Sequence, residues 1–157
     1  MTEELGKRFP HVTFYDPVSV SEDVEIGEGT GIGEFCVIGS NVKIGRNCII
    51  IYHVSIPRGT RIGDNVFIGP NVTMLNDKYP PTNISRPPII DDGAIIGGHT
   101  VIAPEVIIGR RAVIGYGSKV KKDIPPEVVV IGDPLRVLCS RSEYDMKQKE
   151  LINYVQE

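Results

Sequence analysis

The chain has 157 residues, a formal net charge of −3 at pH 7 and no tryptophan. This length is enough for one ordinary domain with its own core. Positive and negative residues are mixed and the balance is slightly acidic, so the charge gives no indication of a nucleic-acid-binding protein.

The composition favours β-structure. The chain contains 22 Ile and 18 Val but only 5 Leu. β-Branched side chains lose rotamer freedom in helices and pack well on pleated strands. The 17 Gly and 12 Pro are too many for long helices and suit a chain with many tight turns. We therefore expect an all-β protein whose core is filled by aliphatic side chains.

The N-terminal residues, MTEELGKRFP, contain no apolar run of the kind found in signal peptides. No stretch of the chain approaches the roughly 18 consecutive apolar residues of a membrane-spanning helix. The three cysteines, Cys36, Cys48 and Cys139, form no CxxC pair, and an odd number without an export signal is typical of a reducing compartment. These features predict a cytoplasmic protein with no membrane partner.

A regular repeat begins near residue 20. Every sixth residue from Ile26 is Ile or Met, and glycine follows most of them; Phe14 and Val20 extend the series upstream. The repeated positions are Ile26, Ile32, Ile38, Ile44, Ile50, Ile56, Ile62, Ile68 and Met74. Four places after each isoleucine of this series stands a small or β-branched residue: Thr30, Cys36, Val42, Cys48, Val54, Thr60, Val66 and Val72.

A six-residue period fits neither an amphipathic helix nor an alternating strand, and a β-sandwich would show it only by coincidence. It predicts a parallel β-helix in which three short strands, eighteen residues, make one coil. Ile32, Ile50 and Ile68 should then stack about 4.8 Å apart, one coil above the next. The small residues should also point inward, and the glycines should permit either an unusual backbone angle or a close approach at the corners.

The stretch TMLNDKYPPTNISRPPII, residues 73–90, interrupts the repeat. Met74 and Ile90 are sixteen residues apart, which is not a multiple of six, so the chain must leave the solenoid wall and return. Four prolines keep the excursion from pairing as another strand. We therefore predict an extended loop over 76–89, and long loops on rigid scaffolds often carry function.

The repeat resumes after the loop at Ile90, Ile96, Ile102, Ile108, Ile114 and Val120. We predict about five coils in one domain, 1–157, with β-helix over 12–75 and 90–133. The last residues, 140–156, read as an α-helix, with Ser140 and Glu143 in the spacing of an N-terminal capping box.

The repeat over residues 20–133 resembles the left-handed β-helix of the hexapeptide-repeat acyltransferases. The closing segment carries that family's landmarks in IGGHTVIAPEV, GYGSKVKKDIPP and GDPLRV, where relatives commonly read G-N-P-A-R. The left hand is implied by this resemblance, because the general rule for crossovers would give a right-handed coil. The resemblance also implies acyl transfer from acetyl-CoA as co-substrate, in a homotrimer whose sites lie between subunits.

The same resemblance suggests where coenzyme A would bind. Small residues keep a groove wall low for the pantetheine arm, and basic residues near the end of the coils suit its phosphates. The residues expected to bind the cofactor are Gly97, Ala103, Gly115, Ser118, Lys121, Lys122 and Arg136, and backbone N–H groups near Gly97 would hold the thioester oxyanion. We expect no metal, because His11, His53 and His99 are 42 and 46 residues apart and form no zinc-binding pair.

The segment DNVFIGPNVTMLNDKYPPT resembles the branch that acetylates an amino group on a nucleotide-linked deoxysugar. The shared pattern falls on Phe67, Gly69, Pro70, Val72, Asn76, Asp77 and Pro80. The resemblance implies that Asn76 and Asp77 bind the acceptor sugar near its amine, and that Lys78 and Tyr79 contact the diphosphate or base. His53, as a proton acceptor, and Asn71 are eighteen residues apart and should stack on one outer column beside the loop.

The loop lacks the histidine that the maltose and galactoside O-acetyltransferases carry there. A sugar hydroxyl is a poor nucleophile and needs a positioned base, whereas a neutral amine attacks a thioester directly. The missing histidine therefore favours an N-acetyltransferase. Two alternatives remain: a sugar O-acetyltransferase that uses His53 or His99 as base, and a non-catalytic β-helix scaffold subunit.

Overall fold

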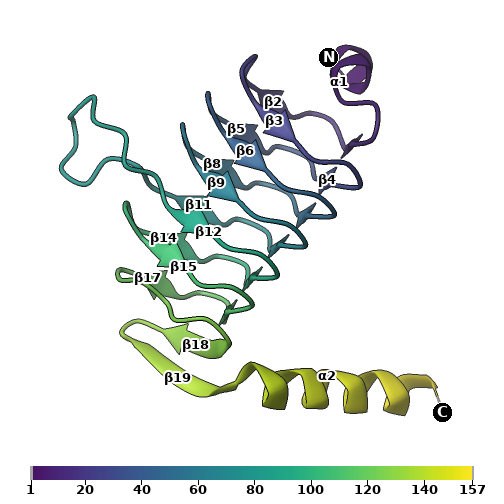
Figure 1. Ribbon diagram of the computed structural model, residues 1–157, viewed down its shortest axis with the longest axis vertical. Helices are drawn as coiled ribbons and strands as arrows, with labels where there is room; N and C mark the ends of the chain where they lie inside the picture. The colour runs from purple at the N-terminus through teal and green to yellow at the C-terminus, as the bar shows by residue number, and fades with distance from the viewer. Residues whose placement is uncertain (1, 157) are drawn as a thin grey trace.

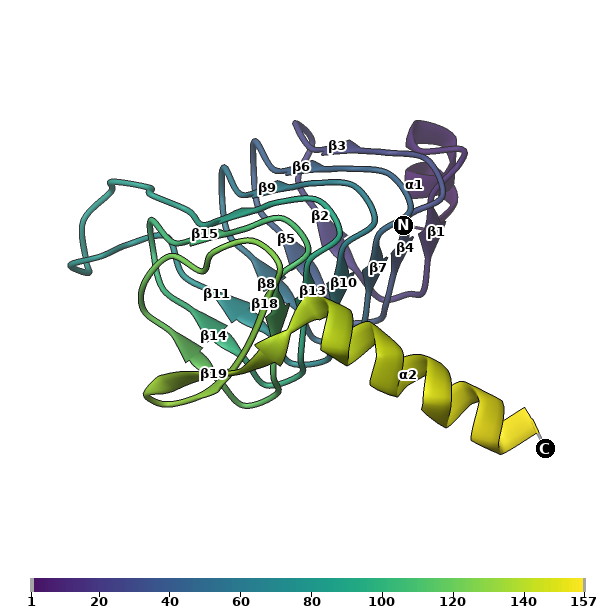
Figure 2. The same cartoon turned by 60° about the horizontal axis from the view of Figure 1, so that its bottom comes forward.

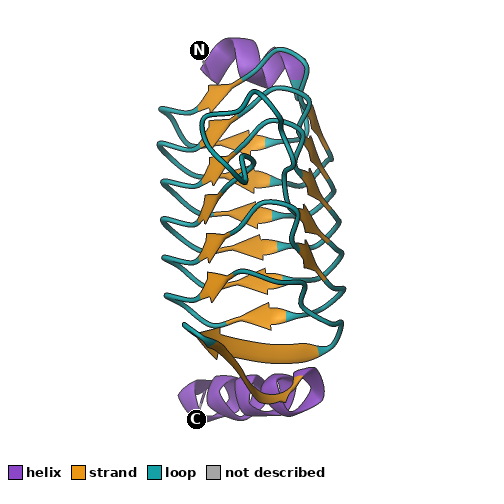
Figure 3. Cartoon of the chain, turned by 90° about the vertical axis from the view of Figure 1, so that its left-hand side faces the viewer, coloured by secondary structure: helices purple, strands orange, loops and turns teal. Residues whose placement is uncertain are grey.

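The computed structural model describes residues 2–156 and shows one stack of flat coils (Figure 1). Each coil is a triangle whose sides are two-residue strands, so the strands gather into three parallel sheets along the solenoid. A helix covers each end of the stack, and one long loop projects from its side (Figure 3). The β-helix predicted from the six-residue repeat is confirmed.

The three sheets are named here A, B and C. Sheet A contains β1 (Thr13–Phe14), β4 (Gly31–Ile32), β7 (Ile49–Ile50), β10 (Phe67–Ile68), β13 (Ile95–Ile96), β16 (Val113–Ile114), β18 (Val128–Gly132) and β19 (Leu135–Ser140). Sheet B contains β2 (Ser19–Val20), β5 (Val37–Ile38), β8 (Ser55–Ile56), β11 (Thr73–Met74), β14 (Val101–Ile102) and β17 (Lys119–Val120). Sheet C contains β3 (Glu25–Ile26), β6 (Lys43–Ile44), β9 (Arg61–Ile62), β12 (Ile89–Ile90) and β15 (Ile107–Ile108).

The strand register follows the repeat. In sheet A, Ile32 pairs with Ile50, Ile50 with Ile68, and Ile68 with Ile96. The last step crosses 28 residues instead of 18, because the loop between β11 and β12 adds ten residues to that coil. The sixteen residues from Met74 to Ile90 therefore leave the stacking of the coils unchanged.

The stack is longer than the predicted five coils. Five coils have three strands each, from β1 to β15. A sixth consists of β16, β17 and a single bridge between Ile108 and Ile124, and β18 begins a further turn. The predicted ranges, 12–75 and 90–133, already contain all of these strands, so the sequence located the β-helix but the number of coils in it was undercounted.

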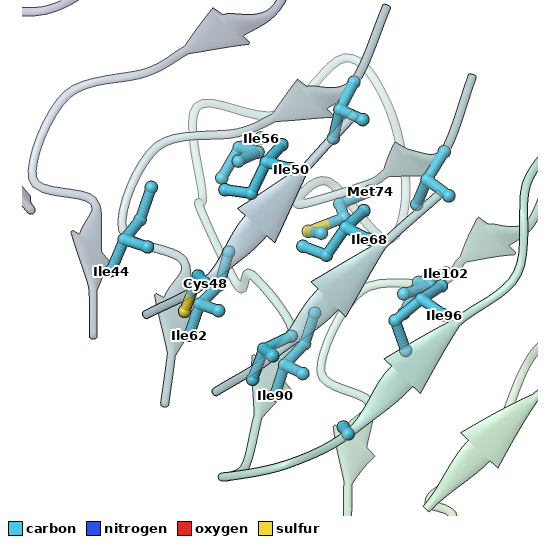
Figure 4. Packing of buried hydrophobic residues seen from close by; sticks show 14 of the residues in the cluster. Ile44, Cys48, Ile50, Ile56, Ile62, Ile68, Met74, Ile90, Ile96 and Ile102 are labelled. Atoms are coloured by element: carbon cyan, nitrogen blue, oxygen red, sulfur yellow. The ribbon is translucent and has the colours of Figure 1, made fainter. Parts of the chain in front are cut away.

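The interior contains two kinds of side chain, as the repeat predicts. The large residues of the three sheets converge on the axis in layers, as Figure 4 shows for Ile44, Ile50 and Ile56. Every small residue four places further is also buried: Thr30, Cys36, Val42, Cys48, Val54, Thr60, Val66, Val72, Ala94, Thr100, Val106, Ala112 and Ser118. The hydroxyls among them bond to backbone, as when Thr30 Oγ1 donates to the Gly45 carbonyl at 2.9 Å.

The corner glycines serve close packing between coils. A Cβ on Gly33 would lie 2.7 Å from the Tyr52 nitrogen, and one on Gly97 would collide with the Tyr116 nitrogen. The left-handed backbone angle that the sequence offered as the alternative falls two residues later in the turn, as at Phe35 (φ 60°). In these corners, the close approach between coils and the left-handed backbone angle therefore fall on different residues.

Helix α1 (Thr2–Arg8) covers the first coil and was not anticipated from the sequence. Leu5 and Phe9 are buried against the core, and Arg8 donates to the carbonyls of Ser21 and Val24. The helix closes an end that would otherwise expose apolar side chains.

The C-terminal end is closed by strand β19, which pairs antiparallel with β18, and by helix α2 (Arg141–Gln156), which runs outward from it (Figure 2). The capping box is confirmed: the Ser140 N–H donates to Glu143 Oε2 at 2.8 Å, and the Glu143 N–H donates to Ser140 Oγ at 3.3 Å. None of the helices formed by residues 2–156 has the length and apolar character needed to cross a membrane.

The glycine geometry predicts two different outcomes for neighbouring substitutions. Gly33→Ala places a methyl group against the backbone of the next coil, and we expect it to lower the free energy of unfolding by about 2 kcal/mol. Gly31→Ala, on the same coil, meets nothing within 4 Å and should change stability by less than about 0.5 kcal/mol. Urea and thermal unfolding of both variants would test this, and equal effects would contradict it.

Candidate functional site

The loop and the candidate residues around it lie along two edges of sheet B. The AB edge is formed by the turns that enter sheet B from sheet A, such as residues 51–54 and 69–72. The BC edge is formed by the turns that leave sheet B for sheet C, including 103–106 and 121–124. The loop, residues 75–88, leaves from the BC edge between β11 and β12 (Figures 1 and 3).

The two ends of the loop are joined by hydrogen bonds. The Arg86 N–H donates to the Asn76 carbonyl at 2.7 Å, and the Asn76 side-chain amide donates to Ser85 Oγ at 3.0 Å. Ser85 Oγ in turn donates to the Arg58 carbonyl, 3.0 Å away on the coil above. Asn76 therefore closes the neck of the loop, and its amide nitrogen is already engaged.

Asp77 organises the interior of the loop. Its carboxylate accepts hydrogen bonds from the Thr82 N–H at 2.6 Å, the Thr82 hydroxyl at 2.8 Å and the Tyr79 N–H at 3.1 Å. These bonds, the one from the Thr82 N–H most of all, lower the pKa of Asp77 below its ordinary value. The carboxylate is therefore ionised at neutral pH and is a weak base.

Charged residues surround a hollow on one side of the loop. Glu105 accepts hydrogen bonds from Lys78 Nζ at 2.6 Å and from Arg86 Nη1 at 2.5 Å. The hollow has a volume of about 220 Å³ and is lined by Asp77, Lys78, Tyr79, Thr82, Ile84, Arg86 and Glu105. A second hollow, of about 500 Å³, is lined by Arg58, Asn76, Asp77 and residues 80–85. Asp77 thus lines both hollows.

The basic residues predicted to meet the coenzyme phosphates lie lower on the same edge. Leu75, Ala103 and Lys121 occupy successive places there, because Leu75 and Ala103 donate their N–H groups to the carbonyls of Ile102 and Val120. A hollow of about 300 Å³ is lined by Lys119, Lys121, Lys122, Asp133, Pro134 and Leu135. Arg136 is exposed on β19 and is not part of this lining.

Asp133 pairs with two of these lysines. Its carboxylate lies 3.0 Å from Lys121 Nζ and 3.1 Å from Lys119 Nζ. Lys121 first, and then Lys119, lower the pKa of Asp133 below its ordinary value. Part of the positive charge in this hollow is therefore neutralised by the protein itself.

The AB edge holds the other candidates. His53, Asn71 and His99 share one column of left-handed turn residues, each with φ 58°, and Asn71 Nδ2 lies 3.5 Å from His99 Nε2. The His53 ring stacks on Phe35, with centroids 4.8 Å apart, and meets the Tyr52 ring edge-on at 5.7 Å. The predicted stacking of His53 and Asn71 on one column is confirmed.

The expectation that this column lies beside the loop of the same chain is wrong. The column and the loop are on opposite edges of sheet B, because strand β11 separates Asn71 from Asn76. Five residues of nearly extended chain cover about 15 Å. Within one chain, His53 and Asn71 therefore do not reach the acceptor residues of the loop.

Three of the residues predicted to bind the cofactor have structural roles. Ser118 is fully buried, where its hydroxyl donates to the Gly115 carbonyl at 2.6 Å and accepts from the Gly132 N–H at 3.0 Å, so it cannot contact a ligand. The Gly97 N–H donates to the Ile114 carbonyl at 2.7 Å, which removes it as an oxyanion donor. A Cβ on Gly115 would collide with the Ile131 side chain.

Sequence reasoning missed Arg86, Glu105 and Lys119. Arg86 lies in the loop and Glu105, 19 residues later, in the turn after β14, so no local pattern links them. Glu105 had one weak signal: it stands in the left-handed position of its turn, where glycine or asparagine is the usual residue. Among the described residues, no three His, Cys, Asp or Glu side chains gather closely enough to hold a metal ion.

Comparison with known proteins identifies the repeat. The profile described as "Bacterial transferase hexapeptide (six repeats)" matches residues 23–58, 41–76 and 87–122, which is more than half of the chain. The chain is 45% identical over 92 residues to galactoside O-acetyltransferase of Escherichia coli, a match that covers 54% of this chain and 45% of that one.

One further relative and one solved structure of similar fold are N-acyltransferases. The chain is 33% identical over 90 residues to 2,3,4,5-tetrahydropyridine-2,6-dicarboxylate N-acetyltransferase of Staphylococcus aureus, covering 57% of this chain and 37% of that one. It thus spans less than half the length of either curated relative. A solved variant of AntD, an N-acyltransferase from Bacillus cereus in complex with dTDP-4-amino-4,6-dideoxyglucose and coenzyme A, has a TM-score of 0.60 and 20% identity, covering 98% and 96% of the two chains.

The hydrogen bonds of Asp77 predict a titration that depends on Thr82. Thr82→Val removes the hydroxyl donor and should raise the pKa of Asp77 towards its ordinary value of about 3.9. Because the folded-state pKa is the lower one, the carboxylate stabilises the loop above about pH 4, and this contribution is lost as the pH falls through the folded-state value. Carboxyl NMR titration measures it, with Thr73→Val on sheet B as control; an unchanged pKa in Thr82→Val would contradict the assignment.

Proposed function

Because the chain belongs to the bacterial hexapeptide transferase family, we propose that it is an acetyl-CoA-dependent N-acetyltransferase acting on a nucleotide-linked amino sugar. One observation carries the proposal. The hollow at the loop brings the ionised carboxylate of Asp77 together with the cations of Lys78 and Arg86, and the loop contains no histidine. The ligands named for AntD, an amino sugar nucleotide and coenzyme A, support it.

Asp77 suits an amine better than a hydroxyl. A carboxylate with a lowered pKa is a weak proton acceptor, so it is poorly suited to activate a sugar hydroxyl. It attracts an ammonium group, and about one lone-pair site, on Oδ2, remains beyond its bonds to Thr82 and Tyr79. After loss of its proton, the neutral amine attacks the thioester carbonyl, the C–S bond breaks, and the thiolate accepts the excess proton.

The two cations beside Asp77 fit a diphosphate. Arginine and lysine both bind phosphate oxygens through charge-assisted hydrogen bonds. Lys78 and Arg86 face the same hollow, and the Tyr79 ring, 75% exposed, can stack on a nucleobase there. The amine would then lie near Asp77 and the nucleotide towards the tip of the loop.

Coenzyme A would extend along the BC edge below the loop. Ala103 keeps the wall low between the loop and the hollow lined by Lys119, Lys121 and Lys122, which suits the coenzyme phosphates. Two coils separate the loop from this hollow, or about 10 Å along the solenoid. Gly115 and Gly97 lie on the AB edge, where they would line the groove from a neighbouring subunit.

The position of the AB edge favours a homotrimer with shared sites. Large apolar side chains are exposed on and beside this edge: Phe35, Val37, Ile49, Tyr52 and Tyr116. An exposed apolar patch of this kind indicates a protein interface. If the AB edge of one subunit faces the loop of the next, Asn71 and His53 of one chain approach Asn76 and Asp77 of another.

A sugar O-acetyltransferase is the second candidate, favoured by the 45% identity to galactoside O-acetyltransferase. Its hydroxyl acceptor would need a base. His53 and His99 lie on the AB edge, and neither belongs to the loop. This function therefore requires an imidazole from a neighbouring subunit at the acceptor.

A panel of acceptors separates the two functions. With acetyl-CoA and release of free thiol as the readout, nucleotide-linked amino sugars should be acetylated and the matching hydroxy sugars should not. Asp77→Asn should lower kcat/KM for the amine at least tenfold, because the ammonium loses its counter-charge, and should leave the dissociation constant of acetyl-CoA within about twofold. Calorimetry measures that constant.

The pH profile distinguishes the mechanisms further. For direct attack, kcat/KM rises with pH until the acceptor amine is deprotonated, and it shifts when an acceptor of different basicity is used. A hydroxyl acceptor would instead give a profile that is set by a basic group of the enzyme and stays the same whatever the acceptor. Transfer to the hydroxy sugars alone would overturn the proposal.

Mixed oligomers test the shared site. Asp77→Ala and Asn71→Ala chains should each be nearly inactive alone. When they are unfolded together and reassembled in equal amounts, about one site in four should combine two intact halves and regain activity. Sedimentation checks the trimer in each sample. No recovery in mixed trimers would place the site within one chain.

A further inference from the structure

Glu105 joins both limbs of the loop to the coil below. Its two carboxylate oxygens accept from Lys78 on the outgoing limb and from Arg86 on the returning limb. Its own N–H donates to the Arg86 carbonyl at 2.9 Å. Glu105 belongs to the turn after β14 and not to the loop, so it fixes the loop from outside.

The backbone at Glu105 gives a second observation. Its φ of 67° lies in the left-handed region, where a side chain is strained and glycine is relaxed. Glycine would suit this turn better, and it occupies the matching place at Gly59 on the same edge, with φ 80°. The turn therefore keeps a glutamate at a backbone angle that disfavours it, and the side chain makes contacts that glycine would lack.

We propose that Glu105 is a positioning residue for the acceptor: it holds Lys78 and Arg86 in place, and with them the hollow that contains Asp77. This inference rests on the proposed function of the loop. Each ion pair is partly exposed, with side-chain accessibilities of 52% for Lys78, 61% for Arg86 and 31% for Glu105, so each alone is weak. Sharing one carboxylate couples the two limbs.

The charges of the three residues match this role. The hydrogen bond between Lys78 and Glu105 raises the pKa of Lys78 and lowers the pKa of Glu105. Both groups therefore remain charged over the neutral range. Without the carboxylate, two cations would face each other across the hollow and repel, and the limbs would separate. Asp77 immediately precedes Lys78 and would move with the outgoing limb.

The chain offers a matched control in Glu127. This residue also has a left-handed φ, of 61°, donates its N–H to a carbonyl of the preceding coil and pairs with an arginine, Arg111, at 2.9 Å. Its turn precedes β18, away from the loop. Substitutions at Glu127 therefore reproduce the backbone and charge changes without touching the acceptor hollow.

The test compares Glu105→Gln and Glu105→Gly with the same changes at Glu127. Amide hydrogen exchange in residues 75–88 should become about fivefold faster in both Glu105 variants and stay unchanged in the Glu127 variants. Glu105→Gly should melt no lower than the wild type, because it relieves the left-handed strain, so loss of folding cannot explain the change. Raising the salt to about 1 M should speed loop exchange in the wild type but not in Glu105→Gln.

Steady-state kinetics gives the functional readout. The KM for the nucleotide-linked amino sugar should rise about fivefold in the Glu105 variants, whereas kcat and the KM for acetyl-CoA stay within twofold. Unchanged loop exchange in Glu105→Gln would overturn the proposal, and so would faster exchange with an unchanged acceptor KM. If the wild type acetylates no amino sugar, the proposed function is wrong, and so is the role of Glu105 in acceptor binding. The exchange data would still report whether Glu105 holds the loop in place.

Discussion

The whole molecule depends on the stacking of inward side chains along a narrow triangular prism. Ile32, Ile50, Ile68 and Ile96 lie in one column because the strand register places each above the last. Three of them are followed by a glycine, Gly33, Gly69 or Gly97, where a Cβ would collide with the backbone of the next coil because the coils lie at strand spacing. Residues that could bind ligands or other subunits are therefore confined to the outer faces of the sheets, the edges between them and the insertions that project from the solenoid.

The loop shows how an insertion can leave a solenoid without disturbing it. Ten extra residues enter one coil, and Ile68 still pairs with Ile96. Outside the wall the loop has no apolar core, so polar contacts give it shape: Asn76 closes the neck, Asp77 binds Thr82, and Glu105 holds both limbs. The residues proposed to bind an acceptor amine, Asn76 and Asp77, therefore also fold the loop.

The triangular cross-section also decides which groups can meet. Sheet B separates the aromatic AB edge from the loop on the BC edge, and the flat strands leave no path between them within one chain. The proposed site shared between subunits would resolve this separation. It would also explain why apolar side chains such as Phe35 and Tyr52 remain on the surface of the isolated chain.

The sequence by itself determined the solenoid, because each inward position repeats a local steric rule. It identified the isoleucine columns, the small buried partners, the place where the loop leaves and the capping box at Ser140. It did not reveal α1, the edge on which His53 and Asn71 lie relative to the loop, or the links from Glu105 to Lys78 and Arg86. Those depend on contacts between side chains 19 or 27 residues apart, and on which of three sides a residue falls. Only the tertiary structure determined these contacts. A periodic sequence specifies how the coils stack, but it does not specify which non-repeating side chains contact one another outside the stack.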